Sequence, residues 1–203
     1  MIKSPLNYTG GKYKLLPQIL PLFPKNIRTF YDVFTGGGNV GINIEASKVI
    51  LNDNLTYLID LYKFIKEHDK QEIISYIENR ILELDLSLTN VEGYLKLREE
   101  YNLKKMPLDL FVLVAFSFNH QIRFNNKHQF NAPFGRERSS FNPVMKKNLL
   151  SFIDRLQEEK LELFNLSFEQ LNYDELNGED LVYCDPPYLI TTGTYNDGKR
   201  GFK

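Results

Sequence analysis

The chain has 203 residues, of which 42% are hydrophobic, and a formal charge of −1 at pH 7. This length and composition suit one globular domain, or one and a half, and argue against disorder. The single cysteine, Cys184, excludes an intramolecular disulfide and a cysteine-built zinc site. Because no signal peptide follows Met1 and no apolar run reaches membrane-spanning length, we expect a cytoplasmic protein with no membrane partner.

The first motif lies at residues 7–12, where Tyr8 and Lys12 surround a Gly-Gly turn. Alone it is equally consistent with a flexible lead-in that carries a surface lysine. Residues 29–34 then read as a strand, and residues 35–41 as a glycine loop that we expect to open a helix. The glycines of this loop fit the spacing G-x-G-x-x-G, with Gly36, Gly38 and Gly41 in the three positions.

A second predicted strand, residues 49–52, ends at Asp53. A strand, a glycine loop, a helix and an acid after the next strand form a nucleotide-binding half, in which the acid accepts hydrogen bonds from a ribose. A structural turn is the alternative. NAD and S-adenosylmethionine both contain such a ribose, but no second half suited to NAD is visible, and the Lys12 ammonium suits the carboxylate of S-adenosylmethionine.

Helical spacing of apolar residues runs from residue 55 to about residue 101, and Pro107 starts a further predicted helix that ends near residues 119–120. We expect these helices to form a separate small domain. Residues 121–138 differ in kind, because cations, asparagines and aromatics alternate there around a predicted β-hairpin. Residues 123–147 contain six Lys or Arg residues and only one acid, Glu137.

This local charge suits DNA phosphates, and Arg and Asn side chains can read guanine and adenine edges. A polar surface hairpin is the bland alternative. His120 and His128 have no metal-ligand partners at sensible spacing, so we expect no metal site.

The last third returns to the sheet. Asn142 and Pro143 form a helix start, residues 161–166 read as a third strand, and residues 180–183 read as a fourth. Ser167 and Phe168 follow the third strand, where they can flank an adenine or can equally be a helix cap and a core aromatic. Because parallel strands share one rim, we expect the glycine loop and the residues after each strand to converge.

After the fourth strand comes Asp185-Pro186-Pro187-Tyr188. The prolines hold the Asp185 carboxylate and the Pro186 carbonyl as rigid acceptors, and Tyr188 supplies a flat surface. Two acceptors can take both hydrogens of an amino group on a flat ring while the tyrosine stacks on that ring. A proline-stiffened turn with no catalytic role is the alternative.

The order of these motifs resembles the Dam-like DNA adenine-N6 methyltransferases. The resemblance rests on Gly-Gly-Lys at residues 10–12, Phe-x-Gly-x-Gly from Phe34, Phe-Asn-x-Pro-Phe-Gly at residues 130–135 and the final Asp-Pro-Pro-Tyr. It implies that Asn119 and Arg123 approach DNA, with Arg123 a guanine contact. Val33 and Ser167 depart from the family pattern, where many relatives have a proline and an acid.

The resemblance implies an α/β fold: a Rossmann-like, S-adenosylmethionine-dependent methyltransferase sheet with a helical and β-hairpin DNA-recognition insert. Residues up to 203 lack the family's last strands, so we expect a fragment, a shortened product or a chain completed by another. We assign residues 1–54 and 142–203 to the catalytic domain and residues 55–141 to the recognition domain. The expected site residues are, for catalysis, Asp185, Pro186, Pro187 and Tyr188; for the cofactor, Tyr8, Lys12, Asp32, Phe34, Gly36, Gly38, Asp53, Ser167, Phe168 and Asp185; and for DNA, Asn119, Arg123, Asn125, Lys127, Asn131, Arg136 and Arg138.

The expected reaction is methyl transfer from S-adenosylmethionine to a flipped adenine in double-stranded DNA. The resemblance implies either a partner of a cognate restriction endonuclease or a solitary Dam-like enzyme. The alternatives are a non-catalytic DNA-binding fragment, a methyltransferase for an RNA base or cytosine-N4, and, from the glycine pattern alone, an NAD-binding domain.

Overall fold

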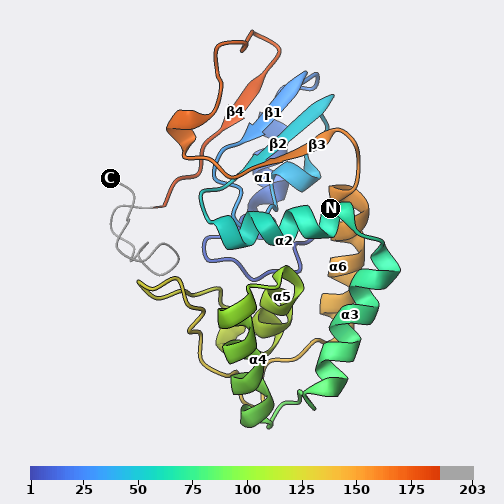
Figure 1. Ribbon diagram of the computed structural model, residues 1–203. Helices are drawn as coiled ribbons and strands as arrows, with labels where there is room; N and C mark the ends of the chain where they lie inside the picture. The colour runs from blue at the N-terminus through green and yellow to red at the C-terminus, as the bar shows by residue number, and fades with distance from the viewer. Residues whose placement is uncertain (188–203) are drawn as a thin grey trace.

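The computed structural model describes residues 1–187, which form a parallel β-sheet and a helical layer beside it (Figure 1). Every strand pairing is parallel, and the strand order is β3-β2-β1-β4. The central strands are almost wholly buried, as expected for a parallel sheet covered on both faces. The strands are β1 (Thr29–Asp32), β2 (Lys48–Asn52), β3 (Leu161–Phe164) and β4 (Leu181–Tyr183).

The helical layer surrounds α5, in which every residue after Pro107 is buried. It packs against α2, α3 and α4, and α2 in turn contacts β3 and α6, so one hydrophobic cluster joins sheet and helices. None of the helices in residues 1–187 is long and apolar enough to cross a membrane. The α-helices are α1 (Leu16–Ile19), α2 (Thr56–Glu67), α3 (Lys70–Glu83), α4 (Val91–Lys104), α5 (Pro107–Phe116) and α6 (Pro143–Leu156), and the 3-10 turns are η1 (Tyr13–Leu15), η2 (Leu20–Leu22), η3 (Gly41–Asn43), η4 (Phe118–His120) and η5 (Phe168–Gln170).

Two predicted helix starts are confirmed. Helix α6 begins at Pro143, and the Asn142 side chain caps it by accepting from the Met145 amide at 2.9 Å. Helix α5 begins at Pro107. Its predicted end near residues 119–120 is wrong, because the helix stops before Ser117, which is extended. The 3-10 turn that follows has Asn119 at a positive φ of 55°.

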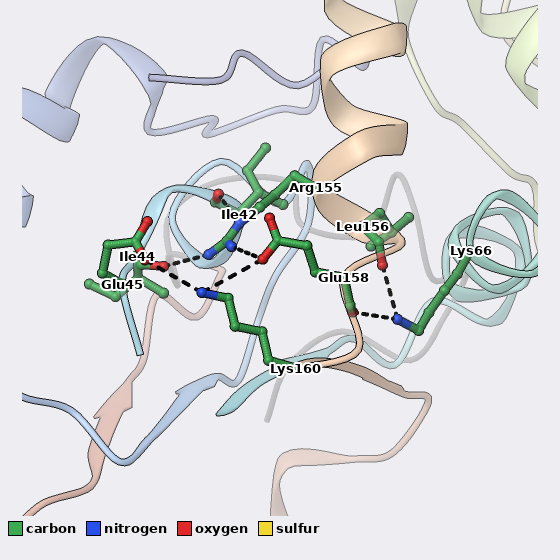
Figure 2. Close-up of polar contacts among 8 residues, drawn as sticks. All are labelled: Ile42, Ile44, Glu45, Lys66, Arg155, Leu156, Glu158 and Lys160. Atoms are coloured by element: carbon green, nitrogen blue, oxygen red, sulfur yellow. Dashed lines mark hydrogen bonds and ion pairs between the residues drawn. The ribbon is translucent and has the colours of Figure 1, made fainter. Parts of the chain in front are cut away.

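The helix predicted after the glycine loop is also wrong, because η3 is a single 3-10 turn that ends at the extended Ile44. The guanidinium of Arg155, on α6, donates to the carbonyls of Ile42 at 2.9 Å and Ile44 at 2.6 Å (Figure 2). Those carbonyls are satisfied by a side chain that lies more than 100 residues away, so the chain after the loop needs no helical hydrogen bonds.

The predicted hairpin in residues 121–138 is present only as a short antiparallel turn. One bridge joins Phe124 and Phe130, and the Asn131 amide donates to the Arg123 carbonyl at 3.0 Å. The Asn125 side chain accepts from the amides of residues 127 and 129, which closes the turn. The predicted strands are therefore reduced to single-residue pairing in this region.

Candidate functional site

The glycine loop lies at the carboxyl ends of β1 and β2, beneath the side chain of Tyr8. Gly36 and Gly38 have φ values of 46° and 75°, a conformation that favours glycine. A Cβ atom at Gly36 would lie 2.9 Å from two atoms of the Tyr8 ring. The N-terminal motif therefore packs directly onto the loop, which has no room for a side chain at Gly36.

Asp32, the last residue of β1, is buried beneath the same loop. Its Oδ2 accepts from the Gly41 amide at 2.9 Å and from the Thr35 hydroxyl at 3.3 Å. Burial raises the pKa of the Asp32 carboxyl to about 7, against the opposing effect of these two donors. The described contacts of Asp32 hold the loop, and its contact with a cofactor stays a prediction.

Asp53 follows β2, where the sequence predicts it, and also holds the loop. One carboxylate oxygen accepts from the Gly36 amide and the other from the Leu55 amide, both at 2.9 Å. The carbonyl of Gly36 accepts from the buried Tyr62 hydroxyl at 2.8 Å. Tyr62 belongs to α2 and lies within the helical spacing of apolar residues that the sequence predicts from residue 55. Its polar tip is the signal that could have marked it as a support of the loop.

Lys12 and Asp185 form an ion pair, with Nζ 2.5 Å from Oδ2. The ammonium also donates to the Gly10 carbonyl at 2.8 Å. Lys12 is predicted to bind the cofactor and Asp185 to serve both catalysis and the cofactor, and the two side chains are in contact. Pro186 and Pro187 follow directly, whereas Tyr188 lies outside the described residues.

Two of the three aromatics assigned to the cofactor also meet. The rings of Phe34 and Phe168 lie 5.8 Å apart, at the ends of β1 and β3. Ser167 forms a capping box for η5, in which its hydroxyl accepts from the Glu169 amide and its own amide donates to the Gln170 side chain. Phe168 is 38% exposed and is therefore not the core aromatic of the alternative reading.

The residues assigned to DNA fall into two groups. Arg123 is folded onto Asn131, donating to its side-chain oxygen at 2.9 Å and to its carbonyl at 2.5 Å. Asn125 closes the turn as described above. The second group is exposed and consists of Asn119, Lys127, Arg136 and Arg138.

One contact links residues 119–138 to residues 7–12, which cover the glycine loop. The Asn7 side chain donates through Nδ2 to the Asn119 carbonyl at 2.9 Å, beside the Tyr8 ring that covers the loop. Residues 7–12 thus contact Asn119, the glycine loop and Asp185. Within residues 1–187 no group of three or more His, Cys, Asp and Glu residues could hold a metal ion.

Comparison with known proteins places this geometry in a family. The model of the D12 class N6 adenine-specific DNA methyltransferases matches residues 8–200. The chain is 54% identical over 202 residues to the type II methyltransferase M.FokI of Planomicrobium okeanokoites, and 52% identical over 201 residues to the modification methylase StsI of Streptococcus sanguinis. These alignments cover 100% and 99% of the chain but only 31% of each relative.

The DNA adenine methylase of Escherichia coli (strain K12) is 30% identical over 195 residues, covering 94% of this chain and 66% of that protein. The chain thus spans about a third of the first two relatives and about two thirds of the third. The motif order inferred from the sequence, the parallel sheet and the matched residues agree, and the chain belongs to the D12 class N6 adenine-specific DNA methyltransferase family.

Proposed function

We propose that this chain provides the donor site, the catalytic acid and a DNA-recognition segment of an enzyme that methylates adenine N6 in duplex DNA. The observation that carries the proposal is the pairing of β1 with β4, in which Asp32 lies opposite Tyr183. This register puts the start of the Asp185-Pro186-Pro187 turn on the same rim as the glycine loop and Asp53. A donor site and an acceptor site that share one rim are what group transfer requires.

The residues around the loop suit S-adenosylmethionine. The Phe34 and Phe168 rings can hold an adenine, Asp53 lies where a ribose would be recognised, and the Lys12 ammonium suits a carboxylate. When bound, that cofactor supplies an electrophilic methyl group on a positively charged sulfur.

The role of Asp185 is to accept from the amino group of the target adenine, together with the Pro186 carbonyl. Hydrogen bonds to both acceptors oppose delocalisation of the nitrogen lone pair into the ring and orient it for attack. Lys12 orients the Asp185 carboxylate through the ion pair. Tyr188 is proposed to stack on the flipped base.

The proposed macromolecular partner is duplex DNA, contacted by the exposed cations of residues 119–138. Because two relatives are named as a type II methyltransferase and a modification methylase, we propose that the whole protein protects DNA from a cognate restriction endonuclease in the cytoplasm. We keep the domain division at residues 54 and 142 as part of the proposal.

The test is incubation of the purified chain with methyl-labelled S-adenosylmethionine and, separately, duplex DNA or RNA, followed by nucleoside analysis. We expect the label to appear in N6-methyladenine from DNA. Asp185→Asn should abolish this labelling, whereas Asp174→Asn, which changes an exposed surface acid, should leave it unchanged. Label on cytosine or only on RNA would refute the choice of substrate. Calorimetry separates the remaining rival, because a DNA-binding fragment would bind no cofactor.

A further inference from the structure

The side chain of Asn102, near the end of α4, is hydrogen-bonded to the backbone of the turn at residues 123–131, here called the recognition turn. Its Oδ1 accepts from the Phe130 amide at 2.7 Å, and its Nδ2 donates to the Phe130 carbonyl at 3.1 Å. One side-chain amide thus satisfies both backbone groups of the same residue, as a neighbouring strand would. An arm of the turn that lacks a third strand is thereby fixed to a helix.

Lys105, three residues later, holds the tip of the turn. It ends α4 in the left-handed conformation, with φ 54°, and its Nζ donates to the His128 carbonyl at 2.7 Å. The same ammonium lies 5.0 Å from the ring centroids of Tyr57 and Tyr101 and 5.9 Å from that of Phe124. Three rings and a carbonyl therefore face this cation, which is an energetically favourable setting for a partly desolvated charge.

Aromatic packing continues from the cation into the turn. Phe124 stacks on Tyr57 with centroids 4.5 Å apart, and Phe124 and Phe130 meet edge to face at 5.7 Å. Both phenylalanines are buried, whereas Lys127 at the tip of the turn is exposed. The turn therefore has an inner side fixed by α2 and α4 and an exposed tip that carries Lys127, one of the residues assigned to DNA.

We propose that Asn102 and Lys105 are positioning residues that set the geometry of residues 123–131 and thereby the enzyme's discrimination between DNA sequences. Neither residue needs to touch DNA for this role. Two arms joined by one bridge are marginal by themselves, and base reading requires donors held to within a fraction of an ångström. This inference rests on the proposed function, because it takes the turn to be the part that reads DNA.

The charge of Lys105 differs in its use from that of its neighbour Lys104. Lys104 is exposed, so it is available to phosphates, whereas Lys105 is directed at protein rings and a carbonyl. Loss of either lysine removes one positive charge from the same helix end. Lys105→Met and Lys104→Met are therefore a matched pair that separates positioning from simple electrostatic attraction.

The experiment uses the full chain and a pool of duplexes with randomised sequence. Duplexes retained by the unaltered protein are enriched over several rounds, and dissociation constants are then measured for the enriched and the starting pools. The specificity ratio is the dissociation constant for the starting pool divided by that for the enriched pool. We expect Lys105→Met to reduce this ratio by about tenfold, the loss typical of one misread base pair. We expect Lys104→Met to weaken binding to both pools equally and to leave the ratio unchanged.

Hydrogen exchange in the free protein provides the second readout. Lys105→Met should accelerate exchange of the Phe130 and Asn131 amides, and Lys104→Met should not. Asn102→Asp, which replaces the donor to the Phe130 carbonyl with an acceptor, should reproduce both effects and keeps the test decisive if Lys105→Met does not fold.

An unchanged ratio in Lys105→Met and Asn102→Asp, with DNA still bound, would overturn the positioning role alone. Failure of the unaltered chain to enrich any DNA would overturn the proposed function and this role together. A fall in the ratio with unchanged melting temperature and unchanged S-adenosylmethionine affinity would support positioning over a general structural role.

Discussion

The buried carboxyl of Asp32 provides a quantitative test of how the glycine loop is supported. Replacement of Asp32 by Asn keeps a side-chain oxygen that can accept from the Gly41 amide and removes the ionisable group. Because Asp32 is only 2% exposed, its ionised form is costly to accommodate. We therefore expect the variant to differ from the unaltered protein in the pH dependence of stability.

The sign and size of this dependence follow from the pKa of Asp32, which burial raises from 3.8 to about 7 in the folded protein. Below about pH 4 the carboxyl is protonated in both states and its contribution to stability is fully present. As the pH rises from about 4 to 7, the unfolded chain ionises first and this contribution is lost. At 1.36 kcal/mol per pH unit the loss is at most about 4 kcal/mol.

The assay is urea unfolding of both proteins at several pH values between 3.5 and 8, with Asp174→Asn as a surface control. The free energy of unfolding of Asp32→Asn, relative to the unaltered protein, should rise with pH over this window and level off above about pH 7. A relative stability that stays constant with pH, or that falls, would refute the assignment of desolvation as the dominant effect.

Of three further predictions, two concern the same rim of the sheet and the third concerns the opposite rim, where β1 and β4 begin. Gly41→Ala would place a methyl group 2.2 Å from a leucine side chain of β2, so we expect a loss of roughly 1–3 kcal/mol in thermal or urea unfolding, and a neutral result would show that the loop can shift. Lys12→Met removes the partner of Asp185, so we expect methyl transfer to fall well below that of the exposed control Lys14→Met, as measured by single-turnover labelling; equal rates would contradict the orienting role. The pKa of Asp180 is lowered to about 2, chiefly by hydrogen bonds from the Arg28 guanidinium. Asp180→Asn should therefore lower the free energy of unfolding at pH 7, and lower it progressively less as the pH falls from about 4 towards 2. An effect that does not change with pH would exclude the Arg28–Asp180 ion pair as the cause.

The sheet and its rim were predictable because their signals are local. Short apolar runs are followed by the glycine loop, Asp53, Ser167 or Asp185, and parallel strands place those ends together. The meeting of the glycine loop, Asp53 and Asp185 needed no knowledge of the packing. The Lys12–Asp185 ion pair was not predicted, because its partners are 173 positions apart and each has a separate functional reading.

The features that sequence reasoning missed depend on contacts between distant segments. The turn at η3 replaces a helix because Arg155 supplies donors from α6. The recognition turn lacks full strands, and Asn102 of α4 satisfies the backbone of Phe130 in place of a neighbouring strand. The Tyr62 hydroxyl distinguishes it from the apolar residues of its stripe, but the Gly36 carbonyl to which it donates is brought to it only by folding.

The position of β4 has a consequence for how the molecule assembles. This strand pairs with β1, although about 150 residues, including the whole helical layer, separate the two in the sequence. Pairings between such distant segments carry a large loop-closure cost and slow the folding of a chain. The helices and the β1–β2 pair can form earlier, from closer contacts. We therefore expect Asp185, the proposed catalytic carboxylate, to be placed in one of the last folding steps, so that recovery of the proposed activity on refolding lags behind recovery of helical structure.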